Sequence, residues 1–242
     1  RAGNAGCNTL VFTVDLAVVG ARYRDVRNGL SGGTGLWGKL RGKLGEILLH
    51  PRWAWDVGVH GKPHVFGNLT EYVPKASTPD DFREWVDSQF DPGVTWKDIE
   101  WLRSFWDGRI VIKGVLNPED AVAAADAGAD AVIVSNHGGR QLDGVSSSIN
   151  MLPRVVEAAG DRTEVLVDSG VRNGQDVVRA LASGARAALI GRPWIWAVAG
   201  RGEPGLRALL KTFHAEMKVS MALTACTSIA DLTPEILERP QG

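Results

Sequence analysis

Short runs of apolar residues recur along this chain, and each is typical of a strand buried on both faces of a sheet. Five runs of this kind are Leu10–Val14, Ile110–Val115, Ala131–Ser135, Val165–Val167 and Ala187–Ile190. Helical patterns separate the last four of them. Because strands that alternate with helices form parallel βαβ units, the pattern predicts an α/β fold with a parallel sheet.

Residues at the ends of the predicted helices support this alternation. Asn117 precedes a proline and two acidic residues, which suits a helix start, and Gly128 suits the end of that helix. Asn173 is placed to cap a second helix, which stops at Gly184. After the last strand, a long helical tail is predicted over Gly205–Leu223.

A long excursion separates the first two predicted strands, and we assign residues 26–95 as an insertion in a single domain that spans residues 1–242. Its second half carries helix-start signals at Pro79 and at Thr95, where Asp98 completes a capping box. Large apolar residues follow at helical spacing and are expected to pack in the core: Phe82, Trp85, Trp101, Leu102 and Phe105.

The first half of the excursion combines leucines at helical spacing with basic residues and tryptophans. These are Leu36, Leu40 and Leu44, then Lys39, Arg41, Lys43 and Arg52, and finally Trp37, Trp53 and Trp55. A basic amphipathic helix of this kind suits the surface of an anionic membrane. An ordinary helix packed on the protein, or a partner-binding surface, accounts for the pattern equally well.

Composition bounds the remaining possibilities. The 242 residues include 27 basic and 28 acidic side chains, so no overall field favours nucleic acid as a partner. Cys7 and Cys226 have no metal-ligand spacing and are expected to be free thiols in a reducing cytosol. No apolar run is long enough to span a membrane, and no signal peptide is recognised. The chain starts at Arg1 without Met, and we expect it to be a fragment.

The most specific chemistry follows the third predicted strand, where residues 135–143 read Ser-Asn-His-Gly-Gly-Arg-Gln-Leu-Asp. A strand that ends this way presents a base, His137, and a cation, Arg140, at its carboxyl end. In barrels of alternating strands and helices, active sites are built at that end. By itself the motif is equally compatible with a surface loop that carries a histidine and a salt-bridged arginine.

Two more charged residues lie at or near predicted strand ends. Asp15 follows the first strand, where it either bonds a loop or orients the ring of His137 and raises its basicity. Lys113 lies inside the second strand, where its ammonium needs a partner. A structural ion pair and a cation that faces a cofactor fit Lys113 equally well.

The last two predicted strands end in sequences that suit a phosphate. Asp168 begins Asp-Ser-Gly-Val-Arg-Asn-Gly after one strand, and Gly191 and Arg192 follow the other. Glycines let backbone N–H groups approach phosphate, and arginine matches it bidentately. In TIM-type barrels phosphate commonly binds at the loops after strands seven and eight. The five strands would then be strands 4–8 of a (β/α)8 TIM barrel.

Taken together and in this order, these motifs resemble the FMN-dependent L-2-hydroxy acid oxidase/dehydrogenase family. The motifs are Thr-Val-Asp with Gly-x-Arg, Val-Ile-Lys-Gly, Ser-Asn-His-Gly-Gly-Arg-Gln-Leu-Asp, Asp-Ser-Gly-Val-Arg and Gly-Arg. His-Pro-Arg-Trp-Ala-Trp-Asp at residues 50–56 and the segments 21–25 and 90–108 are most similar to the bacterial respiratory, quinone-linked L-lactate dehydrogenases within it. The resemblance covers essentially the whole chain.

The resemblance implies a role for each matching residue. His137 would be the catalytic base with Asp15 as its partner, and Arg22 and Arg140 would bind the substrate carboxylate. Lys113 would face the N1/O2 edge of the flavin, Thr13 and Ser135 would hydrogen-bond the flavin, and Asp168 would hold the ribityl chain. The phosphate would be held by Gly170, Arg172, Gly191 and Arg192.

The implied activity is oxidation of L-lactate to pyruvate, with electrons passed through FMN to a quinone or another membrane acceptor. His137 would act as a base toward either the α-carbon or the hydroxyl. The implied location is peripheral, on the cytoplasmic face of the inner membrane, with a homo-oligomer as the complete protein. Another L-2-hydroxy acid such as mandelate or glycolate, an inert barrel fragment and a non-redox phosphate-binding barrel remain alternatives.

The sequence also departs from the family pattern. Ser169 stands where many members carry glycine, Ala17 and Val18 replace a proline-containing stretch, and Ala225 replaces a common glycine. We expect none of these residues to touch a proposed chemical group. The resemblance implies that the first three strands of the barrel, and with them other flavin contacts, are absent, so we expect the chain alone to be poorly soluble or free of flavin.

Overall fold

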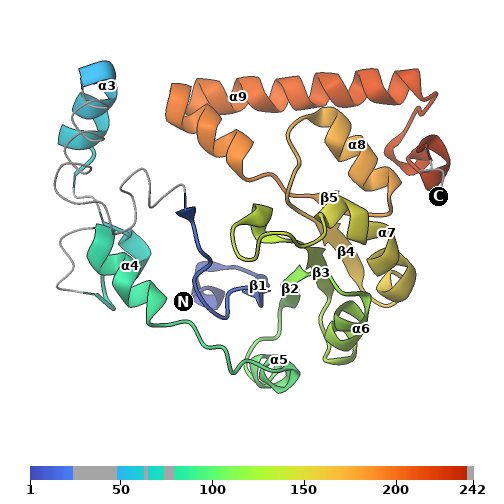
Figure 1. The fold of residues 1–242 in the computed structure, drawn as a ribbon, viewed down its shortest axis with the longest axis horizontal. Coiled ribbons are helices and arrows are strands. Elements are labelled where there is room, and N and C mark those ends of the chain that lie inside the picture. The colour runs from blue at the N-terminus through green and yellow to red at the C-terminus, as the bar shows by residue number, and fades with distance from the viewer. Residues whose placement is uncertain (24–47, 63–64, 74–78, 239–242) are drawn as a thin grey trace. The chain divides into compact units, whose positions relative to one another are not determined.

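The computed structural model describes residues 1–23, 48–62, 65–73 and 79–238 (Figure 1). Two compact units make up the chain. The first combines Arg1–Leu16 with Gly93–Gly242, and the second is Ala17–Pro92. Within the described residues, no helix is both long and apolar enough to cross a membrane.

A five-stranded parallel sheet forms the centre of the first unit, with the strands in sequence order (Figure 1). Its strands are β1 (Thr9–Thr13), β2 (Arg109–Val115), β3 (Ala131–Val134), β4 (Glu164–Val167) and β5 (Ala187–Ala188). All five apolar runs are therefore strands, as predicted. The last one is shorter than predicted, because only Ala187 and Ala188 pair with β4.

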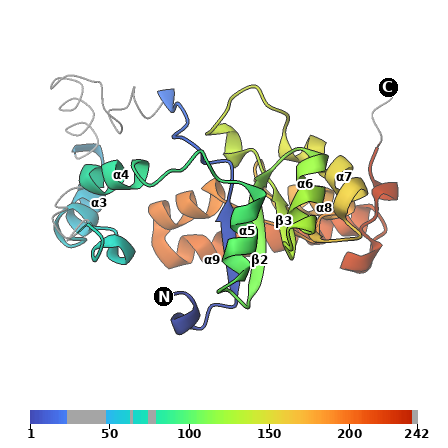
Figure 2. The ribbon, with the colours of Figure 1, turned by 90° about the horizontal axis from the view of Figure 1, so that it is seen from below.

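Helices connect these strands, and Figure 2 shows α6, α7 and α8 beside the sheet. The helices of this unit are α5 (Trp96–Arg103), α6 (Pro118–Asp126), α7 (Ser148–Ala159), α8 (Gly174–Ala182) and α9 (Arg192–Leu223). Asn173 caps α8 as predicted, since its side chain accepts a hydrogen bond of 2.8 Å from the N–H of Asp176. Asn117 precedes α6, but its side chain makes no capping hydrogen bond.

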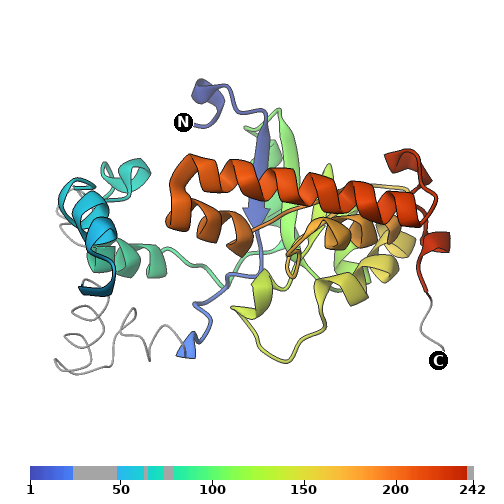
Figure 3. The same cartoon turned by 90° about the horizontal axis from the view of Figure 1, so that it is seen from above.

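The helical tail begins earlier than predicted. Its first residue is Arg192, and a kink interrupts it at Gly202, where φ is 61°. Figure 3 shows the chain reversing direction at this kink. Only glycine adopts this backbone conformation without steric cost, which explains why the periodic pattern was recognisable only after the kink, from Gly205 onward.

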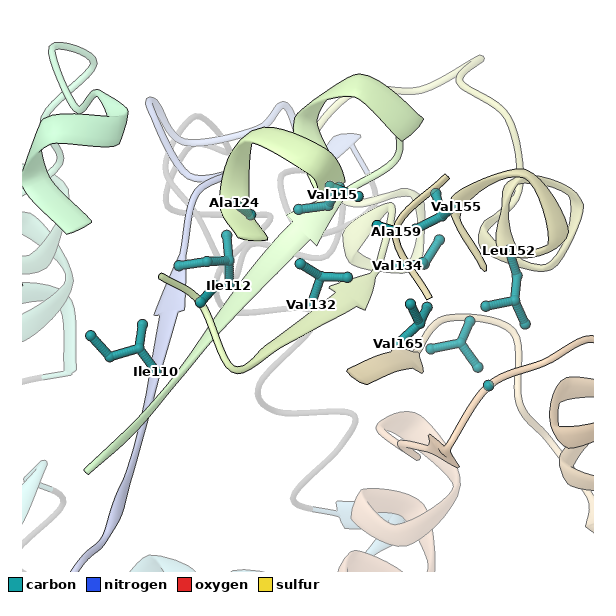
Figure 4. Close-up of a cluster of buried hydrophobic side chains, with 14 of the residues drawn as sticks. Ile110, Ile112, Val115, Ala124, Val132, Val134, Leu152, Val155, Ala159 and Val165 are labelled. Carbon is teal, nitrogen blue, oxygen red and sulfur yellow. The ribbon is translucent and has the colours of Figure 1, made fainter. Parts of the chain in front are cut away.

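Alternation along the strands builds two apolar layers. Ile110, Ile112, Val132 and Val134 face the helices and join a cluster of buried residues there, as Figure 4 shows. Residues at the alternate positions of these strands, among them Ile133, form a second cluster on the other face of the sheet. Because both faces are buried, these strands read as continuous apolar runs in the sequence.

Two of the aromatic residues expected in the core are exposed. Phe82 and Leu102 are buried. Trp101 and Phe105 instead stay at the surface, where their rings meet edge to face with centroids 4.8 Å apart. The prediction was wrong for this pair because α5 covers the sheet with Ile99 and Leu102, which leaves its neighbouring positions facing outward.

The second unit contains short helical segments. Among the described residues they are α3 (Pro51–Trp53), a π-helical turn (Ala54–Val59), a 3-10 turn (Gly67–Leu69) and α4 (Pro79–Asp87). Phe66 packs edge to face on Phe82, and Tyr72 stacks on Trp85 with centroids 6.1 Å apart. The predicted basic amphipathic helix falls almost entirely on residues 24–47, outside the described residues.

Asp130 ties together three segments at the amino-terminal edge of the sheet. Its carboxylate accepts a hydrogen bond of 2.8 Å from the N–H of Ile110 and forms an ion pair with Arg103. Arg103 also donates to the carbonyl oxygens of Gly108 and Gly128. Burial raises the pKa of Asp130, but the Ile110 N–H and the Arg103 guanidinium lower it more, so the pKa lies below its ordinary value of 3.8.

Replacing Asp130 by alanine should therefore lower the free energy of unfolding by about 1–3 kcal/mol at neutral pH, because a backbone donor and a guanidinium lose their acceptor. The contribution of Asp130 is fully present above pH 3.8 and is lost as pH falls through the lower folded-state pKa. Urea unfolding at several pH values measures this. Asp126→Ala, which removes the more exposed ion pair with Arg162, is the control and should cost less. Equal effects of the two variants at neutral pH would contradict the assignment.

Candidate active site at the carboxyl edge of the sheet

A short turn after β3 carries the histidine. His137–Gly139 form a single 3-10 turn, and the Oδ1 of Asn136 accepts a hydrogen bond of 3.1 Å from the N–H of Gly138. The N–H of Asn136 in turn donates to the hydroxyl of Ser148 at the start of α7. His137 has φ of 55°, which is uncommon for a residue other than glycine. The surrounding hydrogen bonds therefore hold the turn in a conformation that the chain alone does not favour.

The structure brings His137 and Asp15 together across 122 residues of sequence. The Nδ1 atom of His137 lies 3.1 Å and 3.2 Å from the two carboxylate oxygens of Asp15. A carboxylate at Nδ1 favours the tautomer that carries hydrogen there and leaves Nε2 able to accept a proton. The pair thus has the geometry of an oriented general base.

Asp15 is itself held in place by β2 and by the loop after β3. The side-chain amide of Gln141 donates to the backbone oxygen of Asp15 over 2.9 Å. Gly114 forms a bulge in β2 with φ of 106°, and a Cβ atom there would lie 2.6 Å from the Cγ of Asp15. Only glycine at position 114 lets Asp15 approach the sheet this closely.

Lys113 has partners directly after the ends of β3 and β4. Its Nζ lies 3.1 Å from the hydroxyl of Ser135 and 3.1 Å from Oδ2 of Asp168. The Ser135 hydroxyl also accepts a hydrogen bond from the N–H of His137. Both contacts use the Ser135 oxygen as the acceptor, because ammonium and amide groups only donate. The hydrogen of this buried hydroxyl is therefore left to donate to a further group.

Ser169 contacts the proposed site, contrary to expectation. Its hydroxyl donates to Oδ1 of Asp168 over 2.7 Å and accepts a hydrogen bond of 2.9 Å from the N–H of Gly138. The prediction that this departure touches no chemical group was wrong. A comparison with the family pattern considers one position at a time. It therefore does not reveal that the loop after β4 reaches the turn after β3.

The ends of β4 and β5 carry the glycines and arginines expected around a phosphate. Gly170 has φ of 84°, and a Cβ atom at Gly170 or Gly191 would meet nothing within 4 Å. The guanidinium of Arg172 lies 5.2 Å from the ring centroid of Trp196. Arg192 donates to the backbone oxygen of Gly138 over 2.6 Å. Open backbone beside two cations is suited to a phosphate group.

The other predicted site residues are placed as follows. Thr13 is the last residue of β1 and pairs in register with Lys113. Arg140 directly follows the His137 turn. Arg22 belongs to the second unit, so its participation with Arg140 stays a prediction. The donors, cations and open glycines at this edge are chemically compatible with FMN, which is anionic at its phosphate and rich in acceptors on its ring.

Four residues that support the site were not singled out from the sequence. They are Gly114, Asn136, Gln141 and Ser148, which hold Asp15 or the His137 turn in place. Each lies within or close to a motif that was recognised, so proximity to a motif was the available signal. Their roles depend on contacts between strands, which a single sequence does not specify.

Replacing Gly114 by alanine should displace Asp15 and break its contact with His137, because the new Cβ meets Asp15 and the backbone φ of 106° becomes strained. A crystal structure of the variant, together with its unfolding midpoint, measures this. Gly200→Ala is the matched control, since a Cβ atom there meets nothing within 4 Å. An unchanged Asp15–His137 distance in Gly114→Ala would show that glycine is not required there.

Known proteins are similar to this chain over nearly its whole length. The L-lactate dehydrogenase of Caulobacter vibrioides is 54% identical over 237 residues, which are 98% of this chain and 61% of the relative. That of Acinetobacter baylyi is 50% identical over 237 residues, with the same 98% and 61% coverage. The chain thus spans about three fifths of the length of these curated relatives.

Solved structures are also similar to this chain. An (S)-mandelate dehydrogenase, described as a monotopic membrane protein, superposes with a TM-score of 0.84 at 36% identity and covers 98% of this chain and 61% of that one. A mandelate oxidase superposes with a TM-score of 0.71 at 37% identity, covering 96% and 56%. The α/β fold with its parallel sheet is that of a TIM-barrel family. A model of the family described as FMN-dependent dehydrogenase matches residues 1–239, and the chain belongs to this family.

Proposed function

We propose that this chain carries the FMN site and the catalytic base of an enzyme that oxidises L-lactate to pyruvate. The observation that carries the proposal is the His137–Asp15 pair, which shares the carboxyl edge of the sheet with the Lys113–Asp168 pair. A base and a fixed cation at one strand edge are what oxidation of a hydroxy acid beside an anionic cofactor requires. The names of the relatives favour lactate as the acid.

FMN would lie along the strand ends, with its ring, ribityl chain and phosphate each held by different strand ends. Thr13, Lys113 and Ser135 would contact the ring, where the free hydrogen of the Ser135 hydroxyl meets an acceptor. Asp168 would bind the ribityl chain. The phosphate would be held by Gly170, Arg172, Gly191 and Arg192. When bound, FMN supplies the acceptor for two electrons, which no side chain of the protein provides.

The side chains would bind the substrate and accept its proton. Arg140 and Arg22 would bind the carboxylate of lactate, since a planar guanidinium matches it bidentately. His137 would take one proton at Nε2, while Asp15 stabilises the resulting imidazolium. Lactate loses two electrons and two protons in forming pyruvate; His137 would hold one proton, and bound FMN would supply the acceptor for the other proton and both electrons, with a quinone or another acceptor as the final oxidant.

The five strands correspond, in our proposal, to strands 4–8 of an eight-stranded barrel. The sheet is parallel and runs in sequence order, and the chain spans only about three fifths of its relatives. Loops after β4 and β5 bear the phosphate-binding sequences, as loops seven and eight do in such barrels. Residues 26–95 would be the insertion between strands 4 and 5, and oligomerisation of the complete protein stays a prediction.

Membrane contact is proposed for the second unit. Leu48, Leu49, Trp53 and Trp55 are all at least half exposed. Exposed tryptophans and leucines beside a basic segment suit a peripheral position at an anionic membrane surface. One solved relative is described as a monotopic membrane protein. The cytoplasmic face of the inner membrane is the location we propose, with a quinone as the electron acceptor.

Mandelate is the second candidate substrate, because the solved structures named above are a mandelate dehydrogenase and a mandelate oxidase. Both are less similar in sequence than the lactate dehydrogenases, at 36% and 37% identity against 54% and 50%. The two substrates share the carboxylate and the hydroxyl that Arg140 and His137 would bind. They differ only in the side chain on the α-carbon, so a direct comparison of the two acids separates them.

The function is tested by replacing His137 with glutamine in FMN-loaded protein that also contains the first three strands of the barrel. Bleaching of the flavin absorption band by L-lactate should slow by ~10²–10⁴-fold, because the proton acceptor is lost, while the amount of bound FMN stays nearly unchanged. The same assay with L-mandelate ranks the two acids. Near-normal bleaching in the variant would exclude His137 as the base, and faster bleaching of the parent by mandelate would favour the second candidate.

Membrane contact is tested by sedimentation with vesicles rich in phosphatidylglycerol. Changing Trp53 and Trp55 to glutamate, or Lys39, Arg41 and Lys43 to glutamate, should reduce the pelleted fraction, because apolar burial or headgroup attraction is lost.

Trp101→Glu is the matched control in the first unit, where the tryptophan is also exposed. This variant should pellet as the parent does. Equal pelleting of all the variants and the parent would refute a membrane role for these residues.

A further inference from the structure

Ser169 has a backbone conformation that its residue type disfavours. Its φ is 72°, and the residues outside glycine that share a positive φ in the described part of the chain are His137 and Ala225. Glycine adopts this conformation freely, whereas serine pays a steric cost. A serine at this position indicates that its hydroxyl makes contacts that glycine cannot make.

The hydroxyl of Ser169 has a fixed direction. A carboxylate only accepts hydrogen bonds, so the hydroxyl hydrogen points to Oδ1 of Asp168, 2.7 Å away. A backbone N–H only donates, so a lone pair of the same oxygen faces Gly138, 2.9 Å away. Ser169 therefore links the carboxylate at the end of β4 to the turn after β3.

This link closes a circuit of hydrogen bonds around the site. From Asp168 the circuit continues through Lys113 to the hydroxyl of Ser135, and from there to the N–H of His137. Two consecutive amides of the turn, at His137 and Gly138, are thus each held by a serine from a different strand end. The Lys113–Asp168 ion pair joins the two serines.

The circuit explains how the His137 turn keeps three successive residues at positive φ, 55°, 67° and 70°, of which only His137 is not glycine. Such a conformation persists only where the surroundings determine it from several directions. Asn136 also accepts from the Gly138 amide, over 3.1 Å, but it belongs to the same turn and moves with it. Ser169 accepts from the same amide but lies in the loop after β4. It therefore fixes the turn relative to β4.

We propose that Ser169 is a positioning residue, which orients His137 and the Asp168 carboxylate relative to each other through its hydroxyl. This inference rests on the proposed function for its catalytic consequence only. The positional part concerns groups within the chain and can be measured without turnover. It assigns a purpose to a residue that the sequence comparison treated as a neutral replacement of glycine.

Two substitutions separate the hydroxyl from the backbone. Ser169→Ala removes the hydroxyl and keeps a side chain at positive φ, whereas Ser169→Gly removes the hydroxyl and relieves the backbone strain. Ser220→Ala is the matched control, since it deletes a hydroxyl that donates over 2.8 Å to the Glu216 carbonyl in α9, away from the site.

The first measurement is amide hydrogen exchange at Gly138 in the full chain, followed by NMR with and without FMN. Both Ser169 variants should exchange this amide about two- to tenfold faster than the parent, as loss of one hydrogen bond predicts. Ser220→Ala should leave it unchanged. Parent-like protection of Gly138 in Ser169→Gly would overturn the proposal, because backbone conformation alone would then hold the turn.

The second measurement is the rate of flavin reduction by L-lactate in FMN-loaded protein that also contains the first three strands of the barrel. Both Ser169 variants should lower the limiting rate about two- to tenfold while the half-saturating lactate concentration changes little, since Ser169 is not part of the carboxylate clamp. A parent-like limiting rate in Ser169→Gly would overturn the catalytic consequence. If the parent itself is not reduced by lactate, the proposed function fails, while the exchange measurement still decides the role of Ser169.

Discussion

Parallel pairing in register is the constraint on which the site depends. Thr13 pairs with Lys113, Lys113 with Ile133, and Ile133 with Leu166, so the carboxyl ends of four strands finish at one level. Asp15, His137 and Asp168 each follow such an end within a few residues. Residues far apart in sequence meet there because every strand delivers its loop to the same edge. A one-residue slip of a strand would turn its side chains to the opposite face of the sheet and shift the loop that follows it.

At that edge every cation of the proposed cofactor site has an internal partner. Asp168 pairs with Lys113, the ring of Trp196 lies under Arg172, and the Gly138 carbonyl accepts from Arg192. These contacts keep the charged groups oriented; Lys113 and Arg192 are partly buried, whereas Arg172 is exposed. An anionic ligand would therefore compete with, or add to, contacts that already exist, and the cations need little rearrangement to receive it.

Much of this arrangement could be predicted from the sequence, for physical reasons that also explain the failures. Strands buried on both faces leave continuous apolar runs, which are visible along the chain. Asn173 caps a helix through contacts with its own neighbours, so local sequence suffices. Trp101 and Ser169 depend instead on which elements lie opposite them. Their environments arise from tertiary packing, and no pattern within a single segment encodes it.

The excursion between β1 and β2 has a consequence for how the protein can change over evolutionary time. A parallel pair of strands needs only a crossover with one helix, and α5 supplies that helix. The unit Ala17–Pro92 is therefore additional to what the sheet requires. Loop-closure entropy costs only about 0.6 kcal/mol for each doubling of a flexible connection. Selection can lengthen, shorten or recompose this unit beyond Arg22 while every strand keeps its register.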